Sequence, residues 1–274
     1  MYKKTTFTFG TITYNHSAVT FAREVHTKDA CYDTYSLIYI AQGTGNYYAE
    51  GVSGILASGK VMLLSPFEYH KLTPQANTPF EFYRVSFQRS SVLQDVNECF
   101  DNLFKRDIKT RVFMSPSIIL HSLLERIESC STMPQDEREL YVKMLFSEII
   151  MILSFNSSKE SSSEKSELGA RVIKYLNENI DRDLSLDYIA QRFFVSKYHL
   201  CRAFKKHNGI SVHGYINKKR VLYAKSLIEA GESAQDAAYK VGFGDYSAFY
   251  RAYFKLLGYS PTAEVRNKVL KEER

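Results

Sequence analysis

The sequence predicts an α+β protein: an N-terminal antiparallel β-barrel with two following helices, then an all-α part in which a long helix joins two helix-turn-helix units. Three observations lead to this prediction. Short runs rich in Tyr, Phe, Val and Ile, punctuated by Gly and Pro, fill residues 18–87. Apolar residues recur at helical spacing between residues 116 and 155. Two similar turn patterns, each followed by a good helix N-cap, lie between residues 184 and 266.

The β-rich part has strand candidates at residues 35–42, 43–50, 60–64 and 80–87. Both alternating faces of residues 80–87 carry large apolar side chains, as expected for a strand that packs on two sides or lines a filled barrel. A small sandwich or barrel therefore fits best.

Residues 92–155 change to a helical period, and two helices split near Met133-Pro134 are expected. Their apolar faces are broader than packing against one small barrel requires. Two interpretations stay open: an intramolecular core against the barrel, or a homodimer interface. The candidate dimer residues are Leu140, Met144, Leu145, Ile149 and Ile152.

The polar, low-complexity segment at residues 156–166 predicts a flexible linker between a domain at 1–155 and a domain at 167–274. Residues 167–274 hold 19 Lys and Arg against 12 Asp and Glu, a formal charge of +7, whereas residues 1–166 carry −1. Such asymmetry is expected when one domain meets a polyanion. The alternative is a merely solvated basic surface.

Other classes of protein are disfavoured. The four cysteines include no CxxC pair, so neither a zinc site nor a disulfide framework is indicated. The first residues lead into no apolar segment of a secretory signal. The most apolar stretch, residues 140–155, is too short to span a bilayer and is interrupted by Lys143 and Glu148. We expect a cytoplasmic protein with no membrane partner.

The first helix-turn-helix pattern follows Leu184. Ser185 is a favourable N-cap for a short helix, and Ser196 caps the next one, residues 197–206. Leu200 and Phe204 are four residues apart and share the face expected to be buried. Tyr198, Cys201, Arg202 and Lys205 lie on the other faces and form a candidate surface for reading a DNA groove.

The second pattern repeats this arrangement. After the Gly242-Phe243 turn, Asp245 is placed as the N-cap of a helix that ends at Leu257. Phe249 and Tyr253 should be buried, again at a spacing of four. A helix that begins just after such a turn can lie in a major groove and touch base edges.

A longer amphipathic helix joins the two patterns. Its length of about 18 residues, at about 1.5 Å each, gives about 27 Å. This length is close to one turn of B-DNA, so it suits a spacer between two adjacent groove contacts.

A signature is spread over both patterns in order. In the second it comprises Ala238, Gly242-Phe243, Asp245, Ser247, Phe249, Arg251, Gly258, Ser260-Pro261 and Arg266. In the first it comprises Leu184, Ile189-Ala190, Val195-Ser196, Leu200, Arg202, Phe204-Lys205-Lys206, Gly209-Ile210-Ser211, Tyr215, Arg220 and Ala224. On these residues the C-terminal hundred residues resemble the DNA-binding domain of AraC/XylS-type transcription regulators. The match is specific because so many positions agree in order.

The resemblance implies roles for residues on the two recognition helices. Those that would face bases are Tyr198, Cys201, Arg202, Ser247, Ala248 and Arg251. Those that would contact phosphates are Ser196, Lys197, Lys205, Lys206 and Tyr246. The two arginines are the strongest candidates because a guanidinium can bond guanine O6 and N7 together. A phosphate contact or a surface ion pair is the alternative for either arginine.

The sequence departs from the family pattern in three places. Phe254 stands where a Lys is usual, which puts one phosphate contact in doubt, and Val265 stands where a Tyr is usual before Arg266. Ala248 and Cys201 are short and poorly polar, so reading at their base pairs would rest on thymine methyl groups or on DNA shape.

The same resemblance implies a cupin-like, effector-binding N-terminal barrel. The usual His pair of a metal-binding cupin is absent from residues 30–34, and His26 and His70 stand alone, so no metal, cofactor or enzymatic activity is expected. The residues that could bind a small molecule are Arg23, Tyr35, Tyr39, Tyr47, His70, Tyr83 and Arg84. Alternatively, the tyrosines simply fill the core.

The leading hypothesis is a regulator that binds double-stranded promoter DNA, senses a small-molecule effector, forms a homodimer and activates through RNA polymerase. One alternative is a regulator without an effector, controlled by its abundance or by a protein partner. Another is a cupin enzyme tethered to DNA, which the missing metal ligands argue against.

Overall fold

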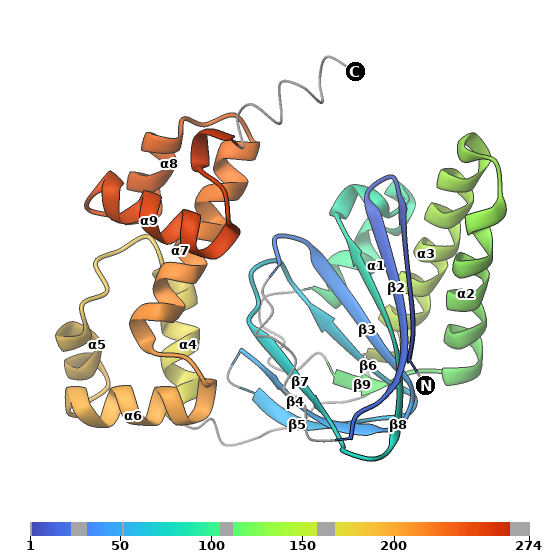
Figure 1. Cartoon of the computed structure of the whole chain (residues 1–274), viewed down its shortest axis with the longest axis horizontal. Helices are drawn as coiled ribbons and strands as arrows, with labels where there is room; N and C mark the ends of the chain where they lie inside the picture. Colours follow the sequence, from blue (N-terminus) through green and yellow to red (C-terminus); the bar gives the residue numbers. More distant parts are fainter. Residues whose placement is uncertain (1, 23–31, 51, 105–111, 158–167, 264–274) are drawn as a thin grey trace. The chain divides into compact units, whose positions relative to one another are not determined.

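The chain folds into two compact domains, residues 1–164 and residues 165–274. All the described strands belong to the N-terminal domain, and the described part of the C-terminal domain is helical (Figure 1). This confirms the predicted order of a sheet-rich part followed by a helical part. The computed structural model describes residues 2–22, 32–50, 52–104, 112–157 and 168–263.

The described strands of the N-terminal domain form two antiparallel sheets. The larger has six strands in the order β1-β2-β8-β3-β6-β9, and the smaller has three in the order β5-β4-β7. The strands are β1 (Tyr2–Phe9), β2 (Ile12–Thr20), β3 (Tyr35–Gln42), β4 (Thr44–Ala49), β5 (Val52–Ala57), β6 (Lys60–Leu64), β7 (His70–Pro74), β8 (Pro79–Phe87) and β9 (Val112–Met114).

Both faces of the larger sheet are apolar, because successive side chains of a strand point to opposite faces. On β3, Ile38 and Ile40 pack against Leu56 and Leu72 of the smaller sheet. Tyr39, between them in sequence, belongs instead to the larger core under the helices. The central strands are therefore buried on two sides, as the pattern of residues 80–87 predicts.

Three helices cover the face of the larger sheet that points away from the smaller sheet (Figure 1). Phe146 lies on the longest of these helices, and its ring centroid is 4.5 Å from that of Phe87 on β8. This contact packs the helix against the sheet. The helices are α1 (Asn97–Leu103), α2 (Ser117–Ser129) and α3 (Gln135–Ser157), with short 3-10 turns at Arg89–Ser91, Gln94–Val96 and Cys130–Thr132. The predicted split near Met133-Pro134 separates α2 from α3.

The predicted dimer residues of α3 do not share one face. Leu145 and Ile149 are buried in the core of the domain, and Ile152 is partly buried against it. The prediction that Leu145 and Ile149 form an intermolecular surface is therefore wrong. Leu140 and Met144 are 59% and 52% exposed. Because α3 is apolar around most of its circumference, hydrophobicity alone does not separate its two faces.

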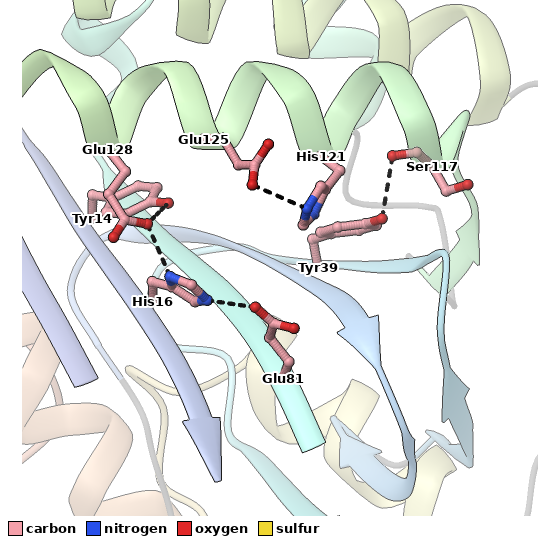
Figure 2. Close-up of polar contacts among 8 residues, drawn as sticks. All are labelled: Tyr14, His16, Tyr39, Glu81, Ser117, His121, Glu125 and Glu128. Atoms are coloured by element: carbon pink, nitrogen blue, oxygen red, sulfur yellow. Dashed lines mark hydrogen bonds and ion pairs between the residues drawn. The ribbon is translucent and has the colours of Figure 1, made fainter. Parts of the chain in front are cut away.

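A polar network fastens α2 to the larger sheet (Figure 2). The buried His16 of β2 lies between two carboxylates: Nε2 is 2.7 Å from Glu81 Oε1 on β8, and Nδ1 is 2.9 Å from Glu128 Oε2 on α2. Tyr14 donates its hydroxyl to the same Glu128 oxygen at 3.1 Å. Burial, assisted by the Glu128 charge, raises the pKa of Tyr14, which keeps this hydroxyl a donor.

The network has a definite proton requirement. Each of the two contacts of His16 is a hydrogen bond only if one proton lies between the ring nitrogen and the carboxyl oxygen. The imidazole and the two carboxyl groups must therefore hold two protons between them. The ring of His16 also stacks on Tyr83 with centroids 4.2 Å apart. His16 thus joins two strands and a helix that are distant in sequence.

We expect His16→Ala to lower the free energy of unfolding by about 2 kcal/mol, because it leaves two partly buried carboxylates without their shared partner. Urea unfolding of the full chain measures this loss. His121→Ala is the control for removing an imidazole, since His121 is more exposed and lies 3.5 Å from Glu125 on its own helix, with its ring 5.5 Å from that of Tyr83. Its effect should be smaller, because it leaves no partly buried carboxylate without a partner. Equal losses for the two variants would contradict the bridging role.

The C-terminal domain is built around one long helix, α7. Phe204 and Tyr215 pack edge to face with centroids 5.7 Å apart, which joins α6 to the first half of α7. Val221 and Ala224, in the second half of α7, belong to a different core with Phe249 of α9. The helices are α4 (Leu168–Glu178), α5 (Leu186–Arg192), α6 (Lys197–Asn208), α7 (Val212–Glu229), α8 (Ala234–Lys240) and α9 (Tyr246–Leu257).

Candidate nucleic-acid interface

The pairs α5–α6 and α8–α9 are two helix-turn-helix units with the same hydrogen-bond pattern. Ser185 and Ser233 cap α5 and α8 by accepting from the backbone N–H three residues later. In the turns, the N–H of Val195 donates to the carbonyl of Ala190, and the N–H of Phe243 donates to that of Ala238, both at 3.0 Å. These bonds align the two units as far as the turn. Gly244 is one additional residue before the N-cap of α9, so the recognition helices are aligned by their N-caps, Ser196 and Asp245.

Each turn contains one residue with a left-handed backbone. It is Phe194 in the first unit, with φ of 55°, and Gly242 in the second, with φ of 91°. A residue with a side chain tolerates this conformation poorly, so glycine is the usual choice there. Phe194 points almost entirely into solvent. The structure offers no packing reason for this phenylalanine.

The recognition helices α6 and α9 are capped at both ends. The Ser196 hydroxyl accepts from the N–H of His199 at 3.1 Å. Both carboxylate oxygens of Asp245 are used, accepting from the N–H groups of Ser247 at 3.1 Å and Ala248 at 2.9 Å. Gly209 and Gly258, both with positive φ, end the two helices. The predicted caps Ser196 and Asp245 are confirmed.

The buried faces of the two helices are equivalent and determine which side chains face outward. Leu200 and Phe204 of α6 are buried, as are Phe249 and Tyr253 of α9. All four residues were expected at these buried positions from their spacing. The opposite faces are open to solvent, as DNA reading requires.

Of the residues expected to read bases, four are exposed and two are half-buried. Tyr198, Arg202, Ser247 and Arg251 are exposed, whereas Cys201 and Ala248 are half-buried. Among the described residues neither arginine has a hydrogen bond or an ion pair with another side chain. Both guanidinium groups are thus available to a ligand.

The residues expected to contact phosphates are more varied. Lys205 and Lys206 are exposed at the end of α6. Lys197 forms an ion pair with Asp187 of α5 at 2.8 Å. Both side chains are exposed, so a DNA phosphate can readily replace Asp187 as the partner of Lys197. The hydroxyl of Ser196 serves as the helix cap. Tyr246 is half-buried, with its ring 5.7 Å from that of Phe249.

Correspondence between the units identifies two outward residues that the sequence reasoning missed. His199 is the counterpart of Ala248, and Tyr250 is the counterpart of Cys201; both are exposed. The ring of Tyr250 stacks on Phe254 one turn later, with centroids 6.4 Å apart and planes 8° apart. Superimposing the two patterns at their N-caps would have revealed both positions.

The candidate effector residues are divided between the two faces of the larger sheet. Tyr35, Tyr39 and Tyr83 lie on the helix side: Tyr35 packs on Phe104, and Tyr39 donates its hydroxyl to the Ser117 carbonyl at 3.2 Å. These three tyrosines form part of the larger core. The structure therefore does not bring the whole set into one pocket.

The other candidates lie on the side of the smaller sheet. Tyr47 belongs to the core between the sheets. Arg84 donates from Nη1 to the hydroxyl of Tyr32 at 2.9 Å, and the Tyr32 ring lies 5.8 Å from that of the buried His70. Tyr32 is thus a neighbour that the sequence reasoning did not include. Arg23 lies outside the described residues.

The residues that the structure describes contain neither a metal-binding cluster nor a membrane-spanning helix. No three His, Cys, Asp or Glu side chains within them are placed to hold a metal ion. None of the helices that they form has the length and apolarity to cross a bilayer.

The two helix-turn-helix units, with exposed arginines at equivalent positions of their recognition helices, define a DNA-binding protein with a separate sheet-rich domain. Family models agree with this description: the AraC-like ligand binding domain matches residues 16–171, and a helix-turn-helix domain matches residues 189–267. The first of these matches alone covers more than half of the chain. The chain belongs to the AraC family of DNA-binding transcriptional regulators and contains the ligand-binding domain of that family.

Several known proteins are similar to this chain over most of its length. An uncharacterized HTH-type transcriptional regulator of Bacillus subtilis (strain 168), YbfI, is 24% identical over 222 residues, which cover 79% of this chain and 78% of YbfI. The HTH-type transcriptional activator RhaS of Escherichia coli O139:H28 is 22% identical over 240 residues, 84% of each chain. Among solved structures, ToxT from Vibrio cholerae O395 covers 93% of this chain and 98% of its own at 17% identity, with a TM-score of 0.44.

Asp245 provides a test of how α9 is formed. Its hydrogen bonds from Ser247 and Ala248 lower its pKa below the ordinary value of 3.8. The charged cap therefore stabilises the folded state above that value, and this contribution is lost as pH falls through the lower, folded-state pKa. We expect Asp245→Ala to lower the melting temperature at pH 7, with a smaller loss for Asp245→Asn, which keeps a cap oxygen.

The difference between wild type and Asp245→Asn should close as the solution is acidified below pH 3.8. Melting curves followed by circular dichroism across pH check this expectation. A melting temperature of Asp245→Ala equal to that of wild type at pH 7 would show that the cap does not hold α9.

Proposed function

We propose that the protein regulates transcription by placing α6 and α9 in two consecutive major-groove segments of promoter DNA. The observation that carries this proposal is the equivalence of Arg202 and Arg251. Each arginine lies on the exposed side of its recognition helix, six residues beyond the N-cap. The opposite side of each helix carries two buried residues, Leu200 and Phe204 on α6 and Phe249 and Tyr253 on α9. The excess of cations in residues 167–274 supplies the nonspecific attraction to phosphates.

Activation through contact with RNA polymerase is part of the proposal. Its support is the similarity to RhaS, whose name describes it as an activator. Neither α6 nor α9 needs to serve this contact, so DNA binding and activation can be separated by variants. Reporter transcription with a variant that binds DNA normally would reveal such a separation.

We also propose that the N-terminal domain binds a polar small molecule beside Tyr32, His70 and Arg84. The family model that matches this domain is one of ligand binding. The guanidinium of Arg84 lies 5.4 Å from the centre of the Tyr32 ring, so a cation, an imidazole and a phenol converge at one edge of the smaller sheet. Such a set can orient an acidic or hydroxylated ligand.

Dimerisation is proposed through the exposed stripe of α3. Leu140, Met144, Met151 and Phe155 recur at spacings of four, seven and four residues, which places them on one side of the helix, and Met151 and Phe155 are 40% and 69% exposed. A twofold axis would bring this stripe against the same stripe of a second copy. This replaces the buried Leu145 and Ile149 of the sequence-based hypothesis.

DNA reading is tested by selecting fragments of sheared genomic DNA with the full-length protein and footprinting the bound sequence at physiological salt. Arg202→Ala and Arg251→Ala should each weaken the selected site by about 10-fold or more, since a bidentate arginine–guanine contact contributes about 1–3 kcal/mol. Unrelated DNA should be affected much less. Lys174→Ala, on the exposed side of α4, is the control for charge loss.

If either arginine variant weakened all DNA sequences equally, that arginine would contact phosphate rather than a base. If the wild type enriched no sequence with or without added metabolites, the proposed promoter binding would fail.

The dimer is tested by sedimentation velocity of Met144→Glu and Phe155→Glu. Each should convert the dimer to a folded monomer, because a charge is placed in an apolar contact between copies. Ile55→Glu alters an equally exposed apolar residue of β5 in the smaller sheet and should leave the dimer intact. A dimer that resists both α3 changes would place the contact elsewhere.

Effector binding is tested by the melting temperature of wild type and of Arg84→Ala in a collection of small metabolites. A ligand of the native state raises the wild-type melting temperature, and Arg84→Ala should abolish most of that rise. No shift with any metabolite would favour the alternative, a regulator controlled by abundance or by a protein partner.

A further inference from the structure

Arg220 lies near the middle of α7, where the cores of the two helix-turn-helix units meet. On one side Tyr215 packs against Phe204 and donates its hydroxyl to Asn177 Oδ1 of α4 at 2.8 Å. On the other side Val221 begins the contribution of α7 to the second core. One helix therefore carries both recognition units end to end.

The guanidinium of Arg220 spans this junction through three backbone carbonyls. Nε donates to the carbonyl of Ile180 at 2.9 Å, and Nη2 donates to that of Arg182; both carbonyls lie in the segment that connects α4 to α5. Nη1 donates to the carbonyl of Gly242 at 2.7 Å, in the turn between α8 and α9. A single side chain thus hydrogen-bonds both the segment that precedes α5 and the turn between α8 and α9.

The junction is tightly packed as well as hydrogen-bonded. A Cβ added to Gly242 would lie 2.8 Å from Nη2 of Arg220 and 2.9 Å from the carbonyl oxygen of Asp181. Glycine therefore serves both the positive φ of this turn and the approach of the guanidinium. Burial lowers the pKa of Arg220, with Asp183 and Asp181 opposing that effect, but an arginine remains charged at neutral pH.

We propose that Arg220 is a positioning residue that fixes the spacing and rotation of α9 relative to α6, so that the domain accepts DNA segments of one separation only. The planar guanidinium offers donors in three directions at fixed angles, which a flexible ammonium does not. Without this brace, bending and twisting of α7 would allow the two units to adjust independently. The inference rests on the proposed use of both recognition helices on DNA.

The test uses the duplex recovered by the genomic selection and two derivatives, with one base pair inserted or removed between the two protected segments. Each change rotates the second segment by about 35° and shifts it by about 3.4 Å. Full-length wild type should lose about 10-fold or more in affinity for either derivative. Arg220→Gln should bind all three duplexes within about 3-fold of one another, with its affinity for the parent duplex reduced.

Two further variants control this measurement. Arg220→Lys keeps the charge but loses the fork, so its selectivity for spacing should fall between wild type and Arg220→Gln. Arg182→Gln removes a neighbouring exposed cation and keeps the backbone carbonyl, so it should retain the wild-type selectivity. Should Arg220→Gln fail to fold, Arg220→Lys gives the result.

A measurement without DNA separates this inference from the proposed function. Spin labels at Lys206→Cys and Lys255→Cys, in a full-length chain without its native cysteines, report the distance between α6 and α9 by electron double resonance. The distribution should be narrow with Arg220 present and broader in Arg220→Gln and Arg220→Lys.

A lower melting temperature with unchanged spacing selectivity and an unchanged distance distribution would reduce Arg220 to a structural role and overturn the proposal. A wild type indifferent to spacing, yet with a narrow distribution that Arg220→Gln broadens, would support the brace and contradict two-helix DNA binding instead.

Discussion

The C-terminal domain depends on one constraint: two recognition helices, each anchored in its own core, must be carried by a single helix. α7 meets this constraint by packing its first half against α6 and its second half against α8 and α9. Arg220 crosses between these halves through three carbonyls. The spacing of Arg202 and Arg251 is therefore a property of the whole domain, because both recognition helices are anchored to the same helix, α7.

In the N-terminal domain, the proposed effector site and the contacts with the helices lie on opposite faces of the larger sheet. The face toward the smaller sheet carries Arg84, and the face toward the helices carries Glu81 and Tyr83, although all three residues lie on β8. His16 connects Glu81 to Glu128 of α2, and α2 shares a core with α3, the helix proposed to form the dimer. The strand that would contact an effector thus also holds the helices that would contact a second copy, which provides a physical connection between the two proposed activities.

The sequence predicted a side chain's position correctly where one periodicity alone distinguishes the buried face of an element from its exposed face. The buried positions of α6 and α9 and their caps were predictable, because Leu200, Phe204, Phe249 and Tyr253 follow helical spacing and Ser196 and Asp245 are strong N-caps. Strand periodicity did not decide between two apolar faces, so Tyr35, Tyr39 and Tyr83 were grouped with His70 although the sheet separates them. Leu145 and Ile149 were misplaced because α3 is apolar on nearly every side. The partners of Arg220 are backbone carbonyls, which leave no signature in the sequence.

The most direct test of the account is the structure of the full-length protein bound to its selected duplex. We expect α6 and α9 to lie in consecutive major-groove segments on one side of the DNA, with Arg202 and Arg251 at base edges and Arg220 still bonded to the three carbonyls. A complex in which only one recognition helix enters a groove, or in which both arginines lie on phosphates, would contradict it.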